Sequence, residues 1–419
     1  MRFLLTPIGS SGDVHPFVGI GRELKSRGHE VVVTTAEPFG EVVRRAGLSF
    51  HANASNEEFD RISKDPDLWH PRRGLQIILR AAAARLREGY AGVERLYQPG
   101  TVLVGHALSF FTRVFEETHG APAATLDLAP SIYRSDHAQP AFAPGYDPSG
   151  WPVWLKRGVW WAVDRFMIDP HLVPPLNAWR RELGLPPVTH VFRDWLHSPR
   201  RVIGLFPEWF APRQPDWPAA LRLTGFPLYD ESEQAALPRP LTQFLDKGSP
   251  PILFTPGSAN QSADRFFRAA LDASARLGRR ALLLTRYSRH LPPLPPTAHH
   301  EPFVPLSQVL PRCAALVSHA GIGTLAQGLA AGVPQLTMPM GFDQPDNATR
   351  LHRLGVGTWV LPAKFEGEPV AAALNRLLQD PQTKVRCDHW ASQIRARNAI
   401  AETCDLLEEL DVTGARARL

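Results

Sequence analysis

The sequence has few cysteines, and they show no pattern that would let them hold a fold together. Only 3 of the 419 residues are cysteine, and Cys313, Cys387 and Cys404 are scattered with no CxxC pair. An odd number of scattered cysteines argues against both a disulfide framework and a cysteine-ligated structural zinc site. A chain of this length can bury a core large enough to fold without such crosslinks.

Long apolar runs and charge tracts are also missing. No run of about 18 apolar residues occurs, so we expect no membrane-spanning helix. The short apolar run at residues 1–6 ends at Pro7 without the pattern of a signal peptide. The formal net charge of +5 is too dilute to indicate nucleic acid, since no basic run exceeds an Arg pair. We therefore expect a cytoplasmic protein that does not bind nucleic acid; the sequence does not indicate its oligomeric state.

Proline, by contrast, is abundant, with 41 residues, about twice the usual frequency. Hydrophobic residues still make up 44% of the chain, which is enough to offset the entropy of folding by burial. The prolines are therefore expected in the loops of an ordered protein. They cluster at 207–240, and because segment 227–240 is also polar, it is predicted to be a linker.

Apolar strands alternate with amphipathic helices on both sides of this linker. The predicted strands are residues 2–6, 31–35, 101–104, 123–126 and 202–205 before it, and 251–255, 281–285, 314–318 and 335–338 after it. Near the start, a loop at 7–12 is followed by a helix at 17–27. The pattern predicts an α/β protein with two Rossmann-like domains facing a central cleft. The domains are residues 1–226 and 241–419, joined by linker 227–240, with the last helix packing back toward the first domain.

The segment SHAGIGTLAQGL, residues 318–329, joins a strand end, a glycine turn and a helix start. The first N–H groups of a helix have no partner within it, and the helix dipole favours negative charge there, which suits a phosphate or diphosphate. Two alternatives stay open. Gly321, Gly323 and Ala326, with Asp343 about 20 residues on, match the dinucleotide motif of an NAD(P)-dependent oxidoreductase. An ordinary tight turn without a ligand is the other.

Two more loops follow predicted strands, where α/β sheets bind their ligands. In the first, Asp13 is either a catalytic base or a helix cap, and His15 is either an alternative base or a structural histidine. In the second, Ser258 belongs to a Thr-Pro-Gly-Ser segment that is either a phosphate-facing loop or a plain turn.

These segments, in this order, resemble one family. Residues 303–347 contain H-x-G-x-G-[ST], G-V-P and D-Q and resemble the donor-binding signature of the family 1 nucleotide-sugar glycosyltransferases, which have the GT-B fold. Residues 9–31 resemble the acceptor-side opening of that family. Within it, residues 207–218, 223–230 and 245–258 are most similar to the rhamnosyltransferases of rhamnolipid synthesis.

The resemblance implies inverting transfer of a hexose from a UDP- or dTDP-linked sugar to a hydroxyl of a small, lipophilic acceptor, with no cofactor and no metal. It implies that Asp13 is the base, with His15 as the alternative. Gln327 stands where many members have Glu. The implied donor-binding residues are Ser258, Phe303, Val304, His319, Gly321, Gly323, Thr324, Gln327, Asp343 and Gln344. A non-catalytic binder of a nucleotide sugar or lipid is a further alternative.

Tryptophans gather in the first half of the chain, and three interpretations of them stay open. They form the wall of an acceptor pocket, belong to the core, or, at 151–168 where they mix with Lys156, Arg157 and Arg165, rest on a membrane surface as a peripheral contact. The residues concerned are Trp69, Trp151, Trp154, Trp160 and Trp161.

Overall fold

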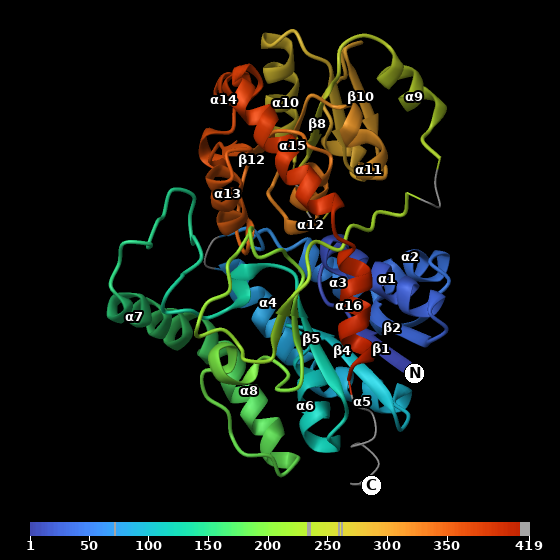
Figure 1. Cartoon of the computed structure of the whole chain (residues 1–419), viewed down its shortest axis with the longest axis vertical. Coiled ribbons are helices and arrows are strands. Elements are labelled where there is room, and N and C mark those ends of the chain that lie inside the picture. Colours follow the sequence, from blue (N-terminus) through green and yellow to red (C-terminus); the bar gives the residue numbers. More distant parts are fainter. Residues whose placement is uncertain (71–72, 233–235, 259, 261–262, 411–419) are drawn as a thin grey trace. The chain divides into compact units, whose positions relative to one another are not determined.

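The computed structural model in Figure 1 describes residues 1–70, 73–232, 236–258, 260 and 263–410. They form two compact units. The first comprises Met1–Pro140, Asp147–Pro227 and the chain from Asn398 onward, and the second comprises Ala141–Tyr146 and Leu228–Arg397. Ala141 is tied to its unit by its backbone N–H, which donates to Asp346 Oδ1 at 2.9 Å.

The first unit is built on a seven-stranded sheet, in which neighbouring strands are parallel, in the order β3-β2-β1-β4-β5-β6-β7. Its strands are β1 (Arg2–Thr6), β2 (Glu30–Ala36), β3 (Ser49–Ala54), β4 (Thr101–His106), β5 (Ala123–Asp127), β6 (Val202–Gly204) and β7 (Leu221–Leu223). Its helices are α1 (Ser11–Ser26), α2 (Gly40–Arg45), α3 (Asn56–Ser63), α4 (Arg73–Ala84), α5 (Leu86–Leu96), α6 (Phe110–His119), α7 (Val153–Val163), α8 (Asp169–Glu182) and α16 (Ala399–Glu408).

Helix α1 begins earlier than the sequence pattern predicts. Ser10 is its N-cap, and Asp13, three residues on, accepts a hydrogen bond from the Ser10 backbone N–H, which together form a capping box. Asp13 and His15 therefore lie in the helix and not in a loop before it. Pro16, which the pattern placed outside the helix, lies inside it.

The last described helix, α16, belongs to the first unit and packs against α1, as Figure 1 shows for the red and blue helices. The Arg27 guanidinium at the end of α1 binds Asp405 at 2.6 Å and Glu408 at 2.8 Å. Cys404 and Leu407 of α16 are fully buried. Apolar burial and paired charge thus hold the chain end on this unit.

The second unit is built on a six-stranded sheet with parallel neighbours in the order β10-β9-β8-β11-β12-β13. Its strands are β8 (Ile252–Thr255), β9 (Ala281–Leu284), β10 (Ala298–Glu301), β11 (Ala315–Ser318), β12 (Gln335–Thr337) and β13 (Gly357–Trp359). Its helices are α9 (Arg239–Asp246), α10 (Asp264–Arg276), α11 (Leu306–Val309), α12 (Ile322–Ala330), α13 (Gln344–Arg353), α14 (Gly367–Gln379) and α15 (Pro381–Arg395).

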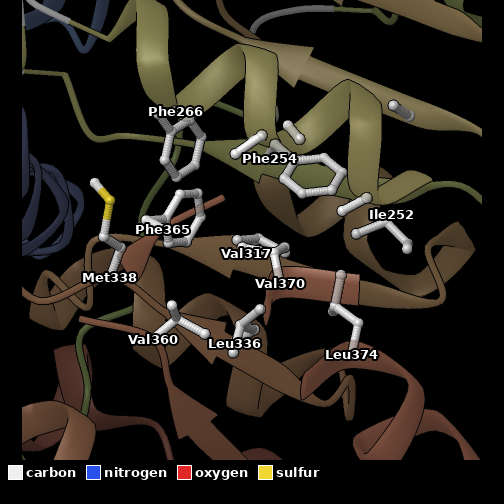
Figure 2. Close-up of a cluster of buried hydrophobic side chains, with 14 of the residues drawn as sticks. Ile252, Phe254, Phe266, Val317, Leu336, Met338, Val360, Phe365, Val370 and Leu374 are labelled. Carbon is white, nitrogen blue, oxygen red and sulfur yellow. The ribbon is translucent and has the colours of Figure 1, made fainter. Parts of the chain in front are cut away.

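Alternate residues of each strand point to opposite sides of this sheet, and buried side chains pack on both sides. On β8, Phe254 packs with the helices α10 and α14, whereas Leu253 packs into a second cluster on the other face. Figure 2 shows the first cluster, in which Phe266 and Phe365 lie side by side with their ring centroids 5.1 Å apart. This stack links α10 to the segment just before α14.

We expect Phe365→Ala to destabilise the second unit by about 3–5 kcal/mol, because a buried ring is lost and a cavity remains beside Phe266. Denaturant unfolding followed by circular dichroism measures the change. The control is Val385→Ala at a position that is 60% exposed, where we expect a change within about 0.5 kcal/mol. Equal effects of the two substitutions would contradict this packing.

Candidate active site

Each sheet has one place where the strand order reverses, and candidate site residues lie at both. In the first sheet the reversal falls between β1 and β4, and in the second between β8 and β11. Loops that leave the carboxyl ends of two such strands run in opposite directions and open a crevice, the usual ligand site of open α/β sheets. Asp13 follows β1, and Ser258 and His319 follow β8 and β11.

The Asp13 carboxylate is held by the backbone around it. Its Oδ2 accepts hydrogen bonds from the Ser10 N–H at 2.6 Å and from the Ser10 hydroxyl at 3.1 Å. Gly9 makes this geometry accessible, since its φ is +134° and a Cβ there would lie 2.2 Å from Oδ2. Asp13 is thus a helix-capping residue through one oxygen, and the capping interpretation and the base interpretation are compatible.

The second oxygen of Asp13 faces His106, the last residue of β4. His106 Nε2 lies 3.9 Å from Asp13 Oδ1. The Leu108 backbone N–H donates to His106 Nδ1 at 3.2 Å, so in the neutral ring the proton is on Nε2, facing Asp13. Burial lowers the pKa of His106, against the opposing pull of Asp13 and Asp127, which favours this neutral form.

A buried polar cluster lies at the end of β5, the strand next to β4. Asp127 is 1% exposed, and its Oδ2 lies 3.0 Å from His197 Nε2. Burial, with Asp127 nearby, raises the pKa of the Tyr133 hydroxyl, which therefore stays protonated. Carboxylate and imidazole groups thus alternate along the ends of three neighbouring strands.

His15 lies two residues after Asp13 on α1, which turns its side chain about 200° around the helix axis. The two side chains leave opposite sides of the helix and cannot serve one proton position. The contact with His106 favours Asp13 for the role at this edge.

The turn after β11 is built around His319. Two glycines leave room for its ring, since a Cβ on Gly257 would lie 2.6 Å from it and a Cβ on Gly321 would lie 2.5 Å from it. Burial lowers the pKa of His319 to about 4, so the ring is neutral at pH 7. Its Nδ1 is buried without a hydrogen-bond partner in the described part of the chain.

Helix α12 begins beside this ring. Its N-cap is Gly321, which has no side chain to cap the first turn, and Gly323 and Thr324 lie in that turn and are partly exposed. Uncapped N–H groups, the helix dipole and a neutral imidazole make a donor set that suits an anion such as a diphosphate.

The loop between β12 and α13 meets the same turn. Asn347, which is fully buried, donates to the Ala320 carbonyl at 2.9 Å and to Asp343 Oδ2 at 2.6 Å. Ala320 and Phe342 both have left-handed backbone, with φ of 68° and 59°. Strained residues of this kind persist where the surroundings hold them, often at functional sites. Asn347 therefore joins the His319 turn to Asp343.

The other residues predicted to bind the donor differ in the surface that they expose. Ser258 is exposed, and Phe303 is 37% exposed with the Arg286 guanidinium 5.6 Å from its ring centroid. Val304 is 3% exposed and packs in the core, so its side chain is not available to a ligand and only its backbone can be. The sequence prediction did not distinguish these two neighbours.

The two candidate glutamines are buried. Gln344 is 3% exposed, and its Oε1 accepts hydrogen bonds from the backbone N–H groups of Met340 and Gly341. Gln327 is 7% exposed on α12. Donor-binding roles for both stay predictions.

The tryptophans divide between core and surface. Trp160 is 1% exposed, so the core interpretation is right for it. Trp154 and Trp161 are 71% and 58% exposed, Trp151 is 37% exposed, and Trp69 is partly buried. A role of these four in acceptor binding stays a prediction.

Sequence reasoning missed His106 and Asn347. Asn347 ends the segment 303–347 and lies four residues after Asp343. Because residues four apart are neighbours on a helix, this spacing could have predicted the contact between the two side chains. His106 lies two residues beyond the predicted strand 101–104 and ends the observed strand β4, and its contact with Asp13 depends on β4 lying beside β1.

Within the described residues, no helix is long and apolar enough to span a bilayer. In the same part of the chain, no cluster of three His, Cys, Asp or Glu side chains is suited to hold a metal ion.

Comparison with known proteins identifies the family. Residues 3–89 match the glycosyltransferase family 28 N-terminal domain, and residues 270–410 match the C-terminal domain of erythromycin biosynthesis protein CIII-like proteins. The chain is 31% identical over 431 residues to O-mycaminosyltylonolide 6-deoxyallosyltransferase of Streptomyces fradiae, covering 98% of this chain and 97% of that one.

Solved structures agree on the fold. The glycosyltransferase of kitacinnamycin has a TM-score of 0.75 at 22% identity, covering 97% of this chain and 98% of its own. Spinosyn rhamnosyltransferase SpnG, complexed with thymidine diphosphate, has a TM-score of 0.68 at 19% identity, covering 98% and 100%. The oxidoreductase alternative is therefore set aside, and this chain belongs to the family 1 glycosyltransferases of the GT-B fold.

Proposed function

We propose that this glycosyltransferase moves a hexose from a dTDP- or UDP-linked donor to a hydroxyl of a small, lipophilic acceptor, with inversion at the anomeric carbon. The observation that carries the proposal is the uncapped start of α12 beside His319, whose donors suit an anion, in a chain that also holds Asp13 in a fixed orientation. Thymidine diphosphate in a structural relative supports dTDP-sugars as the first donors to test.

The donor diphosphate is proposed to bind at the α12 start. The first-turn N–H groups and the Thr324 hydroxyl donate to its oxygens, and the neutral His319 ring donates from one nitrogen. The same donors stabilise the charge that grows on the diphosphate as it leaves, so no metal ion or cofactor is part of the proposal. Phe303 offers a ring face on which the nucleobase of the donor stacks, and the Asp343 carboxylate accepts hydrogen bonds from the sugar hydroxyls.

Asp13 is proposed to take the proton of the acceptor hydroxyl. Because Oδ2 already accepts two hydrogen bonds from Ser10, Oδ1 is the oxygen that receives the proton. The acceptor oxygen bonds the anomeric carbon as the bond from that carbon to the diphosphate oxygen breaks. A carboxylate suits a late proton transfer, when the attacking hydroxyl has become acidic.

His106 is proposed to position Asp13. Its Nε2–H faces Oδ1 and favours one rotamer of the carboxylate, while Ser10 fixes the other oxygen. It is a positioning residue and not the base, because its Nδ1 already accepts from Leu108 and its Nε2 carries the proton.

The acceptor class rests on the relatives. The Streptomyces fradiae relative is named for transfer to O-mycaminosyltylonolide, which supports a small-molecule acceptor here too. A cytoplasmic location is part of the same proposal, since all three cysteines are free and buried, as a reducing compartment allows.

The direct test is incubation with dTDP- and UDP-hexoses over a panel of lipophilic alcohols and phenols, following the released nucleoside diphosphate. Asp13→Asn is expected to lower kcat by about 10²–10⁴-fold with unchanged donor affinity, because Asn keeps the capping geometry and loses the base. Unchanged melting temperature is the folding control. Release by Asp13→Asn at the native rate would contradict the role of Asp13.

His106→Gln is expected to lower kcat by about 10- to 100-fold, with little change in donor affinity, because Asp13 Oδ1 loses its fixed orientation. The matched measurement is kcat of the double variant with Asp13→Asn: because His106 acts through Asp13, the double variant is expected to fall no further than Asp13→Asn alone. Additive losses would show that the two residues act separately.

Gly321→Ala is expected to weaken binding of dTDP or UDP by about 10- to 100-fold, since its Cβ would displace the His319 ring and cost a charge-assisted hydrogen bond. Titration calorimetry measures the affinity. The control is Gly92→Ala on α5, where an added Cβ meets no atom within 4 Å.

The pH dependence of donor binding gives a check on His319. With a pKa near 4 the ring does not titrate between about pH 6 and pH 8, so it adds no step near 6.5 to the affinity. Because the unfolded ring binds a proton below about 6.5, the stability contributed by the neutral ring is present above that pH and is lost as the pH falls toward 4. A binding step near pH 6.5 that His319→Asn removes would contradict the neutral assignment.

A further inference from the structure

Helix α7 continues directly into the π-helical turn η3 (Asp164–Ile168), and the exposed surface of these two elements is rich in aromatic and basic side chains. Its exposed residues are Val153, Trp154, Arg157, Gly158, Trp161, Arg165 and Phe166, which we call the α7 face. Three large aromatic side chains and two arginines stand here, and none of the exposed residues of this run is acidic. An exposed aromatic group of this size usually marks an interaction surface.

The aromatic residues form a stripe along the helix. Trp154 and Trp161 are seven residues apart, which is two turns or about 10 Å along one side. The rings of Trp161 and Phe166 pack edge to face with centroids 5.8 Å apart. Phe166 is 62% exposed, so the stripe continues beyond α7.

The opposite side of the run is firmly anchored, so the stripe is held outward. Trp160 is buried and donates from Nε1 to the Ser135 carbonyl at 2.8 Å. The Arg134 guanidinium lies 3.9 Å from the Trp160 ring centroid and pairs with buried Asp164 at 3.1 Å. Lys156 is buried and donates to the His137 carbonyl at 2.8 Å.

The charge of the face is positive. Arg165 is exposed, with its guanidinium 5.8 Å from the Phe166 ring centroid. Arg157 is exposed and bonds Asp136 at 2.9 Å. Asp136 is buried and also bonds Arg193, so the positive charge of Arg157 and Arg193 together exceeds the negative charge of this carboxylate. The neighbourhood therefore presents cations among tryptophans.

We propose that the α7 face docks on the surface of an anionic lipid bilayer. Tryptophan and phenylalanine enter the headgroup region, where an amphipathic ring suits the boundary between water and acyl chains, and the arginines pair with lipid phosphates. The helix lies in the plane of the surface, as an interfacial helix does.

A second copy of the chain is a poorer occupant. A two-fold contact of this face with itself would bring Arg157 and Arg165 of both copies into one interface, with no exposed acid of the face to neutralise them. An anionic surface supplies the charge that the face lacks.

The test is co-sedimentation of the full chain with phosphatidylcholine vesicles made with and without phosphatidylglycerol. We expect binding to the phosphatidylglycerol vesicles that weakens as salt is raised, because the arginine contacts are screened. Trp154→Ser combined with Trp161→Ser is expected to weaken this binding at least about tenfold, since much of the buried apolar area is lost. The matched control is Leu361→Ser combined with Val385→Ser, two exposed apolar residues of the other unit.

Arg165→Gln tests the charge separately, and we expect it to reduce both the affinity and its salt dependence while the nucleotide affinity stays native. The proposal would be overturned by no sedimentation with anionic vesicles, by equal binding to neutral and anionic vesicles, or by native binding of the double tryptophan variant. Dimers that the tryptophan substitutions abolish, without vesicle binding, would overturn it in favour of a second copy.

Discussion

The organisation of both candidate sites depends on one geometric constraint, the reversal of strand order within a parallel sheet. Neighbouring parallel strands end at the same edge, and where the order reverses, the two following loops diverge. This occurs between β1 and β4 in the first unit and between β8 and β11 in the second. Asp13 and His106 lie at the first reversal, and Ser258 and His319 lie at the second. Each pair is therefore brought together by topology, although 93 residues separate Asp13 from His106 in the sequence.

Glycine and asparagine then adjust the backbone at these edges. Gly9 lets Asp13 reach the Ser10 amide, and Gly257 and Gly321 leave space on either side of the His319 ring. Asn347 holds the strained Ala320 by its carbonyl and Asp343 by its carboxylate. The two sites thus use the same means, a helix start after a buried strand. They differ in charge: the first places a carboxylate in the first turn, while the second leaves the helix start uncapped for an anion.

Much of this was accessible from the sequence, because buried strands such as residues 2–6 and the spacing around His319 are strong local signals. The fold class and the enzyme family are confirmed. What escaped prediction has physical causes. β3 and β10 are largely polar and lack the apolar run of a central strand, and β7 and β13 have three residues each. The start of α1 was misplaced because Pro16 looked like a boundary, whereas the Ser10 capping box sets it. The contact of His106 with Asp13 requires knowing which strands are neighbours, and the burial of Val304 beside exposed Phe303 requires the packed core.

In the proposed function, the helix start at α12 holds the nucleotide of the donor while the Asp13 edge serves the acceptor. Hydrogen–deuterium exchange of the native chain with and without dTDP or UDP tests it directly. We expect nucleotide to protect the backbone amides of residues 318–326 and to leave those of residues 9–15 at their unliganded rates. Protection confined to residues 9–15, or no protection at 318–326 with saturating nucleotide of either kind, would contradict it.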